Sequence, residues 1–277
     1  MSSKKRILYI SQEVTPFLKS SEISKNVKTL AQKTQESGKE IRVFMPRYGL
    51  VNERRNQLHE VIRLSGMNMI INDVDHPLII KVASIPSAKM QVYFIDNEEY
   101  FKRKAIVKDE KGKLFEDNVQ RSVFFIRGTL ETVKKLGWIP DVIHCHGWMT
   151  ALLPLYLKTY FKDDPHYANT KVVSSLYEDS FEGELNDNIE DILKFDGVEE
   201  SFMNHIKNGS DYLNLTKTAI DHSDGIVLFS DKIDSEIIDY VNKADADSLK
   251  FVNSEQHHED CSNFYDEILE KEPKLAE

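Results

Sequence analysis

The sequence has few of the features that mark disulfide-rich, membrane-spanning or nucleic-acid-binding proteins. Its 277 residues include two cysteines, Cys145 and Cys261, so we expect no disulfide framework. No apolar run approaches membrane-spanning length and the chain begins without an apolar signal region, so we expect a cytoplasmic protein that makes no membrane contact. The formal net charge of −10 excludes the basic footprint that a nucleic-acid partner requires.

The excess negative charge is concentrated at the C-terminal end. Residues 244–277 contain ten acidic residues and three lysines, so we divide the chain into a near-neutral domain, residues 1–243, and an acidic tail, residues 244–277. Within the tail, Phe264, Tyr265, Ile268 and Leu269 form a narrow apolar stripe at helical spacing. The tail is therefore predicted to be partly helical and to dock on the domain through this stripe.

Alternating apolar and amphipathic segments predict an α/β fold. Residues 6–11 are a near-continuous apolar run, residues 23–34 place apolar side chains at helical spacing, and residues 40–45 are apolar again. A strand, a helix and a strand within about forty residues form a βαβ unit, which indicates a Rossmann-like, doubly wound parallel sheet. Further runs predict the strands of a β-rich insert, at residues 58–64, 67–71, 78–85 and 90–95.

A later segment predicts a long amphipathic helix. Asp117 stands where it can cap the helix, and the apolar positions that follow predict a face packed on the sheet. Arg121 is polar on this helix, so we expect its side chain to be solvated rather than catalytic.

Residues 138–150 are the centre of the predicted site. A Gly-Trp-Ile-Pro turn leads into the apolar strand 142–145, whose carboxyl end presents His146, Gly147 and Trp148. In an open parallel α/β sheet, ligands bind at that end of the strands. His144 and His146 are two residues apart and should face the same side of the strand, whereas Cys145 should face the other side.

Two groups of residues contain histidine and cysteine, the side-chain types that commonly bind metal ions in proteins. His144, Cys145 and His146 follow one another on a strand, so their side chains do not converge on one ion. In the tail, His257 and His258 lie close to Cys261, but no second cysteine pair completes a site. We therefore predict no metal site and no cofactor.

Three segments carry a resemblance to a known family. Pro140-Asp-Val-Ile-His-x-His-x-Trp148, followed by a Thr-Ala-Leu helix, resembles the central motif of bacterial glycogen synthases and plant starch synthases. Residues 115–125 and 171–183 are similar to two further segments of these enzymes. The resemblance covers residues 6–241 and implies one half of a GT-B glycosyltransferase fold, the C-terminal half being absent. It also implies ADP-glucose and α-1,4-glucan as substrates, and substrate-binding roles for Lys19, His146, Trp148 and Tyr177.

The sequence departs from the family pattern at its chemically important positions. Ser20 and Ser21 replace two glycines that let the backbone approach the nucleotide diphosphate, and Glu22 places a carboxylate in the following helical turn. Elsewhere, three residues that differ from the family replace an aspartate, a histidine and an asparagine: Gly147, Tyr177 and Glu178.

These departures lead to two hypotheses. The first is a catalytically impaired relative, with no catalytic residue assigned, that binds α-glucan or a protein partner in glycogen metabolism. The second is an active glucosyltransferase, transferring glucose from ADP-glucose to α-1,4-glucan, that is completed by a separate C-terminal half.

Overall fold

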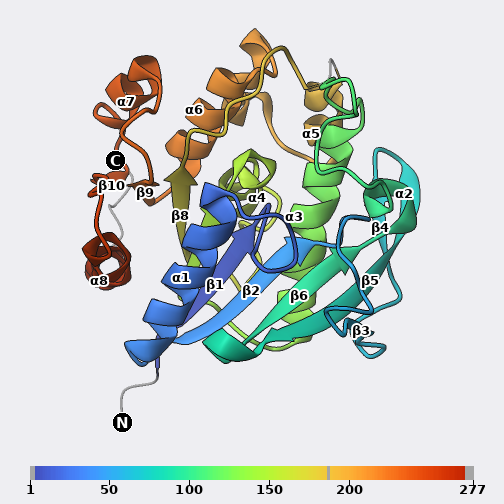
Figure 1. Cartoon of the computed structure of the whole chain (residues 1–277). Helices are drawn as coiled ribbons and strands as arrows, with labels where there is room; N and C mark the ends of the chain where they lie inside the picture. Colours follow the sequence, from blue (N-terminus) through green and yellow to red (C-terminus); the bar gives the residue numbers. More distant parts are fainter. Residues whose placement is uncertain (1–3, 186–187, 272–277) are drawn as a thin grey trace.

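Strand β1 (Arg6–Ser11) lies near the middle of a mixed sheet in the computed structural model, which describes residues 4–185 and 188–271. The strand order is β10-β9-β8-β7-β1-β2-β6-β5-β3, with β4 paired to β5 outside this path. All pairs from β10 to β6 are parallel. The doubly wound α/β fold with a β-rich insert is therefore confirmed (Figure 1).

Outside the β-rich insert, strands and helices mostly alternate along the chain, whereas α2 and β10 were not predicted. The other strands are β2 (Glu40–Pro46), β3 (His59–Glu60), β4 (Met67–Ile71), β5 (Val74–Ile85), β6 (Met90–Asp96), β7 (Val142–His146), β8 (Lys171–Leu176), β9 (Gly225–Leu228) and β10 (Asp247–Leu249). The helices are α1 (Glu22–Glu36), α2 (Glu98–Phe101), α3 (Asn118–Lys135), α4 (Leu153–Lys158), α5 (Ile189–Phe195), α6 (Tyr212–His222), α7 (Ser235–Val241) and α8 (Gln256–Glu270).

The insert is antiparallel and shorter at its start than predicted. β5 pairs with β6, β3 and β4 in antiparallel register. The strand expected over residues 58–64 is reduced to β3, because the amide of Leu64 bonds the carbonyl of Val61 and turns the chain. Ile62 lies in this turn and is 82% exposed, so its apolar side chain does not mark a strand.

Helices α1 and α3 both begin directly after the residue that the sequence indicates, whereas the side-chain capping bond predicted for α3 is wrong. Ser21 caps α1 by accepting from the amide of Ser24, and the Ser24 side chain completes the reciprocal bond. Asp117 makes no capping bond to α3, since its carboxylate pairs with Arg103. An ion pair to a neighbouring loop thus replaces the expected helix cap.

The expectation that Arg121 is solvated is also wrong, because the side chain is fully buried. Its Nε donates to the carbonyl of Tyr100 at 2.9 Å and its Nη1 to the Oδ1 of Asn118 at 2.7 Å. The guanidinium also faces three aromatic rings, and burial lowers its pKa to about 10. Arg121 therefore binds the segment around α2 to α3.

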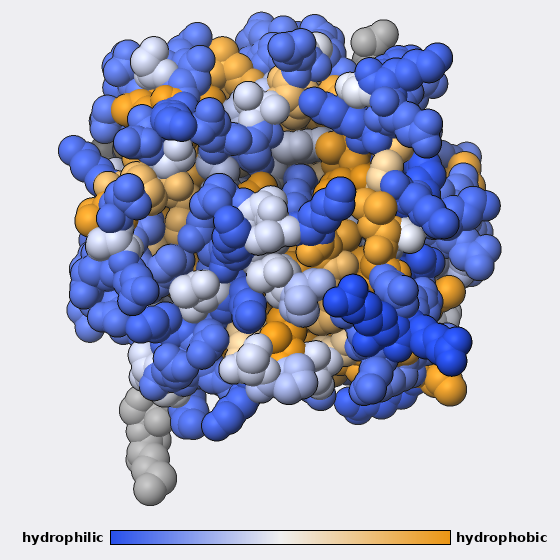
Figure 2. All heavy atoms as spheres, viewed as in Figure 1, coloured by the Kyte–Doolittle hydropathy of each residue, from blue (hydrophilic) through white to orange (hydrophobic). Residues whose placement is uncertain are grey.

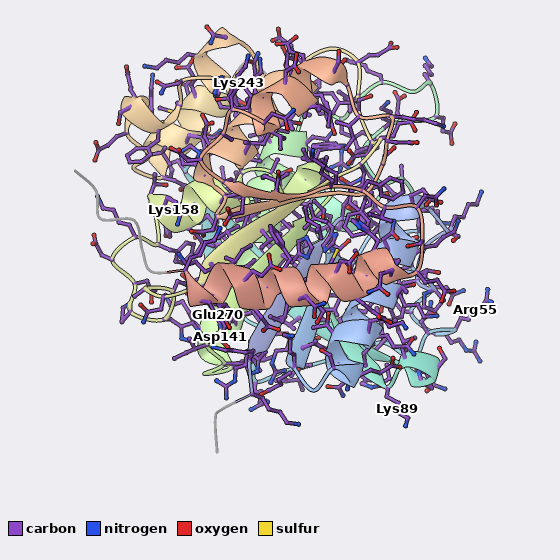
Figure 3. The ribbon with its side chains drawn as sticks, turned by 90° about the vertical axis from the view of Figure 1, so that its left-hand side faces the viewer. Arg55, Lys89, Asp141, Lys158, Lys243 and Glu270 are labelled. Carbon is purple, nitrogen blue, oxygen red and sulfur yellow. The ribbon has the colours of Figure 1, made fainter. Side chains whose placement is uncertain are left out.

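The tail contributes both a strand and a docked helix. β10 extends the parallel sheet beside β9, and α8 packs beside α1. Phe264 and Ile268 are buried, and Leu269 is partly buried against the same core, as the stripe predicts. A Cβ at Gly225 on β9 would overlap Ile268, so glycine at this position allows the close approach of α8. Figure 3 shows α8 as the outermost layer on its side of the molecule.

No helix among residues 4–185 and 188–271 is long and apolar enough to cross a membrane. Figure 2 shows that hydrophilic residues cover most of the viewed face, with a group of hydrophobic residues to the right of its centre.

Candidate functional site

One cavity lies at the point where successive strands stop being added on one side of β1 and begin to be added on the other. From β1 the chain builds outward through β2 and then returns to β7 on the other side of β1. The carboxyl ends of β1 and β7 are joined by a bond from the amide of Gln12 to the carbonyl of His146, at 2.9 Å. Such a switch point is where ligands bind in open α/β sheets.

This first cavity has a volume of ≈ 520 Å³. The loops after β1, β7, β8 and β9 line it together with the start of α1 and the segment before α8. Its lining residues are Gln12, Glu13, Ser21, Glu22, Ile23, Val107, Lys108, Trp148, Tyr177, Glu178, Asp179, Ser180, Phe181, Phe229, Ser230, Asp231, Lys232, Phe251 and Asn253.

Carboxylates outnumber cations in this lining. Two lysines, Lys108 and Lys232, face five carboxylates, those of Glu13, Glu22, Glu178, Asp179 and Asp231. Among the lining residues, the Nζ of Lys232 lies 3.9 Å from the Oε2 of Glu178. The cavity therefore carries net negative charge and is rich in hydrogen-bond acceptors.

Asp179 is a site residue that sequence reasoning missed. One carboxylate oxygen accepts from the backbone amide of Trp148 at 3.3 Å, and the other accepts from the hydroxyl of Tyr212 at 2.8 Å. Partial burial raises the pKa of Asp179 to about 6, against the lowering effect of the Tyr212 bond. Asp179 thus joins the loops after β7 and β8 to the start of α6.

Tyr177 and Trp148 form part of the aromatic lining. Tyr177 stacks on Phe229 with 5.0 Å between ring centroids and 10° between ring planes, and only 3% of its surface is exposed. Trp148 packs against Phe181 at 5.0 Å between centroids. Both rings are therefore held against neighbouring aromatic side chains of the same lining.

His146 lies beneath the cavity and does not line it. It is fully buried, and its Nδ1 shares a 2.9 Å hydrogen bond with the hydroxyl of Tyr177. Its ring lies 4.0 Å from that of His144, so both histidines share one side of β7 as predicted. Burial lowers the pKa of His146 to about 3, so the imidazole is neutral at physiological pH.

Gly147 adopts a backbone conformation that is nearly restricted to glycine. Its dihedral angles are φ 85° and ψ 153°. A Cβ at this position would lie 2.8 Å from the Cβ of Gln12. The site therefore does not accommodate the aspartate of the family pattern without a local rearrangement.

The start of α1 faces a carboxylate within the protein itself. The hydroxyl of Ser21 donates to the Oε2 of Glu13 at 2.7 Å while it caps the helix, and Glu13 is 9% exposed. Glu22 adds a second, exposed carboxylate in the first turn, which pairs with Lys25 at 3.1 Å. The positive end of the helix is thus already complemented by negative charge.

Lys19 does not line the first cavity. It is exposed in a neighbouring cavity of ≈ 560 Å³, which shares Glu13 and Ser21 with the first and also contains Phe17 and Arg55. The structure therefore brings Trp148 and Tyr177 together, places His146 below them, and places Lys19 to one side.

The first cavity continues into a second of ≈ 450 Å³ towards α6 and α7. Tyr177, Phe181 and the pair of Glu178 with Lys232 are among the residues common to both. In the part of the chain that the structure describes, no group of three histidine, cysteine or acidic side chains is placed to hold a metal ion.

Comparisons with known proteins agree with the motifs. The family model described as the starch synthase catalytic domain matches residues 6–249. A glycogen synthase of Chlorobium limicola is 35% identical over 84% of this chain and 47% of its own length, and one of Chlorobium chlorochromatii is 40% identical over 62% of this chain and 35% of its own length. The chain thus spans about half the length, or less, of the relatives that it matches.

A solved structure supports the same fold. The catalytic domain of Starch Synthase IV from Arabidopsis thaliana, bound to ADP and acarbose, superposes with a TM-score of 0.72 at 18% identity, covering 91% of this chain and 52% of that one. With the match of the family model and the identity to the glycogen synthases, this chain belongs to the starch synthase catalytic domain family.

Proposed function

We propose that this chain binds a neutral α-glucan in the first cavity and is a catalytically impaired relative that does not itself transfer glucose from ADP-glucose. The observation that carries the proposal is the lining of the cavity, which contains aromatic rings together with five carboxylates and two lysines. Carboxylates accept hydrogen bonds from sugar hydroxyls, and aromatic rings supply apolar contact surface. This combination suits an uncharged, hydroxyl-rich ligand.

The same lining disfavours a nucleoside diphosphate sugar. A diphosphate at the start of α1 would meet Glu13 and Glu22, where helix N–H groups would otherwise favour an anion. Like charges repel, and the repulsion is stronger for the buried carboxylate of Glu13 than for that of Glu22, which is exposed to solvent and paired with Lys25 at 3.1 Å. Such repulsion discriminates between ligands without any change in the fold.

The conformation of Gly147 supports the loss of glucosyl transfer. The family pattern has a carboxylate at this position, and here the backbone dihedral angles and the contact with Gln12 disfavour one. Tyr177, at the family's histidine position, donates or accepts a bond with His146 and stacks on Phe229. Its hydroxyl is therefore engaged inside the protein.

Retardation in native gels that contain glycogen tests glucan binding. Phe251 lines the cavity and is partly buried, so Phe251→Ala should reduce the retardation. Phe195, on α5 and 49% exposed outside both cavities, provides the matched control Phe195→Ala, which should migrate as the wild type does. Equal loss in both variants, or no retardation of the wild type, would refute the proposal.

A transfer assay with radiolabelled ADP-glucose and glycogen tests the second half of the proposal. We expect no incorporation of label above the protein-free background. Incorporation by the purified chain would refute the impairment and support an active glucosyltransferase.

A further inference from the structure

Helix α8 is attached to the core through a tyrosine rather than through apolar contacts alone. Tyr265 is fully buried, and its hydroxyl lies 2.7 Å from the Nδ1 of His144 and 3.1 Å from the hydroxyl of Tyr9. The Tyr9 hydroxyl in turn donates to the Oγ1 of Thr34 on α1. Because buried polar groups need partners, the position of Tyr265 on α8 is set by hydrogen-bond geometry as well as by packing.

Hydrogen bonds and one ring contact lead from Tyr265 to the cavity. His144 bonds the hydroxyl of Ser175 through Nε2 at 2.6 Å, and its ring lies against that of His146. His146 bonds the hydroxyl of Tyr177, which lines the cavity. An unbroken series of contacts thus joins α8 to the cavity floor.

The segment that leads into α8 also forms part of the cavity wall. Phe251 and Asn253 line the first cavity. At the start of α8, His257 bonds the carbonyl of Leu228 at 2.9 Å, and its ring lies 4.9 Å from that of Phe229, the stacking partner of Tyr177. Displacement of α8 would therefore disturb the wall and the floor together.

We propose that Tyr265 is a positioning residue of the glucan site, and that it couples docking of α8 to ligand binding. The inference rests on the proposed function for the identity of the ligand. When α8 is docked, His144 and Tyr177 keep their positions and the segment before α8 completes the cavity wall. When α8 is displaced, the cavity is incomplete. Linkage requires the effect to be reciprocal, so the ligand must also stabilise the docked helix.

Tyr265→Phe tests the proposal, because it keeps the ring and removes the hydroxyl that His144 bonds. We expect maltoheptaose to bind the variant about tenfold more weakly than the wild type in calorimetric titration, well below the melting temperature. Tyr167→Phe is the matched control, since Tyr167 is 5% exposed and its hydroxyl donates to the carbonyl of Leu130, away from the cavity. The control should lose stability and keep its affinity.

Stabilisation of the docked helix by the ligand can be measured directly, and it is not expected if Tyr265 contributes only to the stability of the fold. In the wild type, maltoheptaose should slow hydrogen exchange of the backbone amides in α8, which does not itself line the cavity. Unchanged affinity in Tyr265→Phe, or unchanged exchange in α8 on saturation with ligand, would overturn the coupling.

Hydrogen exchange measured without ligand tests the coupling separately from the proposed binding of glucan. Tyr265→Phe, and independently Gly225→Val, whose side chain would push against Ile268 and Phe264, should accelerate exchange in α8 and in residues 177–181 together. If exchange rises in α8 alone, the coupling is wrong even if glucan binds. If the wild type does not bind maltoheptaose but both segments respond, the coupling stands and the assigned ligand is wrong.

Discussion

Replacement of Gly147 by aspartate should destabilise the protein, although it restores the residue of the family pattern. At φ 85° and ψ 153°, Gly147 occupies a region that is essentially restricted to glycine, where another residue costs about 1 to 3 kcal/mol. The added Cβ would also lie 2.8 Å from that of Gln12, and overpacking of this kind costs about 1 to 3 kcal/mol. We therefore expect Gly147→Asp to lower the free energy of unfolding by roughly 3 kcal/mol.

Urea unfolding monitored by circular dichroism measures this change. For a chain of this size, roughly 3 kcal/mol corresponds to a melting temperature lower by about 6 to 12 °C. Gln12→Ala leaves the Cβ that makes the contact, so Gln12→Gly is the variant that removes it. Introducing Gly147→Asp into the Gln12→Gly variant should therefore lower the free energy of unfolding by less than it does in the wild type, because the overpacking contribution is absent.

A second glycine, Gly197, separates the backbone contribution from the overpacking contribution. Gly197 has φ 80°, and no described atom outside its chain neighbours lies within 4 Å of its added Cβ. Gly197→Ala should therefore cost only the backbone part, about 1 kcal/mol, and less than Gly147→Ala. If Gly147→Asp is as stable as the wild type, the reasoning from the conformation of Gly147 is refuted.

Three further predictions concern pH, Asp179 and the tail. Burial lowers the pKa of His146 to about 3 from the ordinary 6.5, so the unfolded chain binds the additional proton, and acidification from pH 6.5 to 4.5 should lower the urea midpoint. The raised pKa of Asp179 has the opposite effect, because the folded chain binds the additional proton between about pH 4 and 6. Burial also lowers the pKa of four other histidines, so we expect the loss of stability on acidification to prevail, and a constant urea midpoint would contradict this expectation. Asp179→Asn should weaken maltoheptaose binding about tenfold in calorimetric titration, because one of two accepted bonds is lost, whereas Asp191→Asn on α5 should not; equal affinities would remove Asp179 from the site. Deletion from Glu259 onward removes five buried residues of α8, which are Cys261, Ser262, Phe264, Tyr265 and Ile268. Burial of Phe264 and Ile268 alone is worth roughly 1.5 to 3 kcal/mol each, a large part of the stability of a typical domain, so the melting temperature should fall sharply, and an unchanged value would contradict the docking.

Local patterns in the sequence were sufficient to predict the framework of the fold. The apolar runs that became β1, β2 and β7 are continuous because both faces of a parallel sheet are covered. The cap at Ser21 and the shared side of His144 and His146 follow from local geometry. Each of these features depends on neighbours within a few residues.

The features that the sequence did not predict depend on contacts between distant segments. Asp179 is one of several acids after β8, and only the amide of Trp148 and the hydroxyl of Tyr212 distinguish it. Arg121 is buried because the segment around Tyr100 covers α3. Tyr265 belongs to an acidic tail, and its partner His144 lies 121 positions earlier in the chain. No periodicity in the sequence reports such pairs.

Calorimetric titration of the purified chain with maltoheptaose and, separately, with ADP-glucose tests the central claim most directly. The negatively charged, aromatic cavity predicts that maltoheptaose binds and that ADP-glucose produces no measurable heat of binding. Clear binding of ADP-glucose would contradict the account, because it would show that the carboxylates of Glu13 and Glu22 do not exclude a diphosphate.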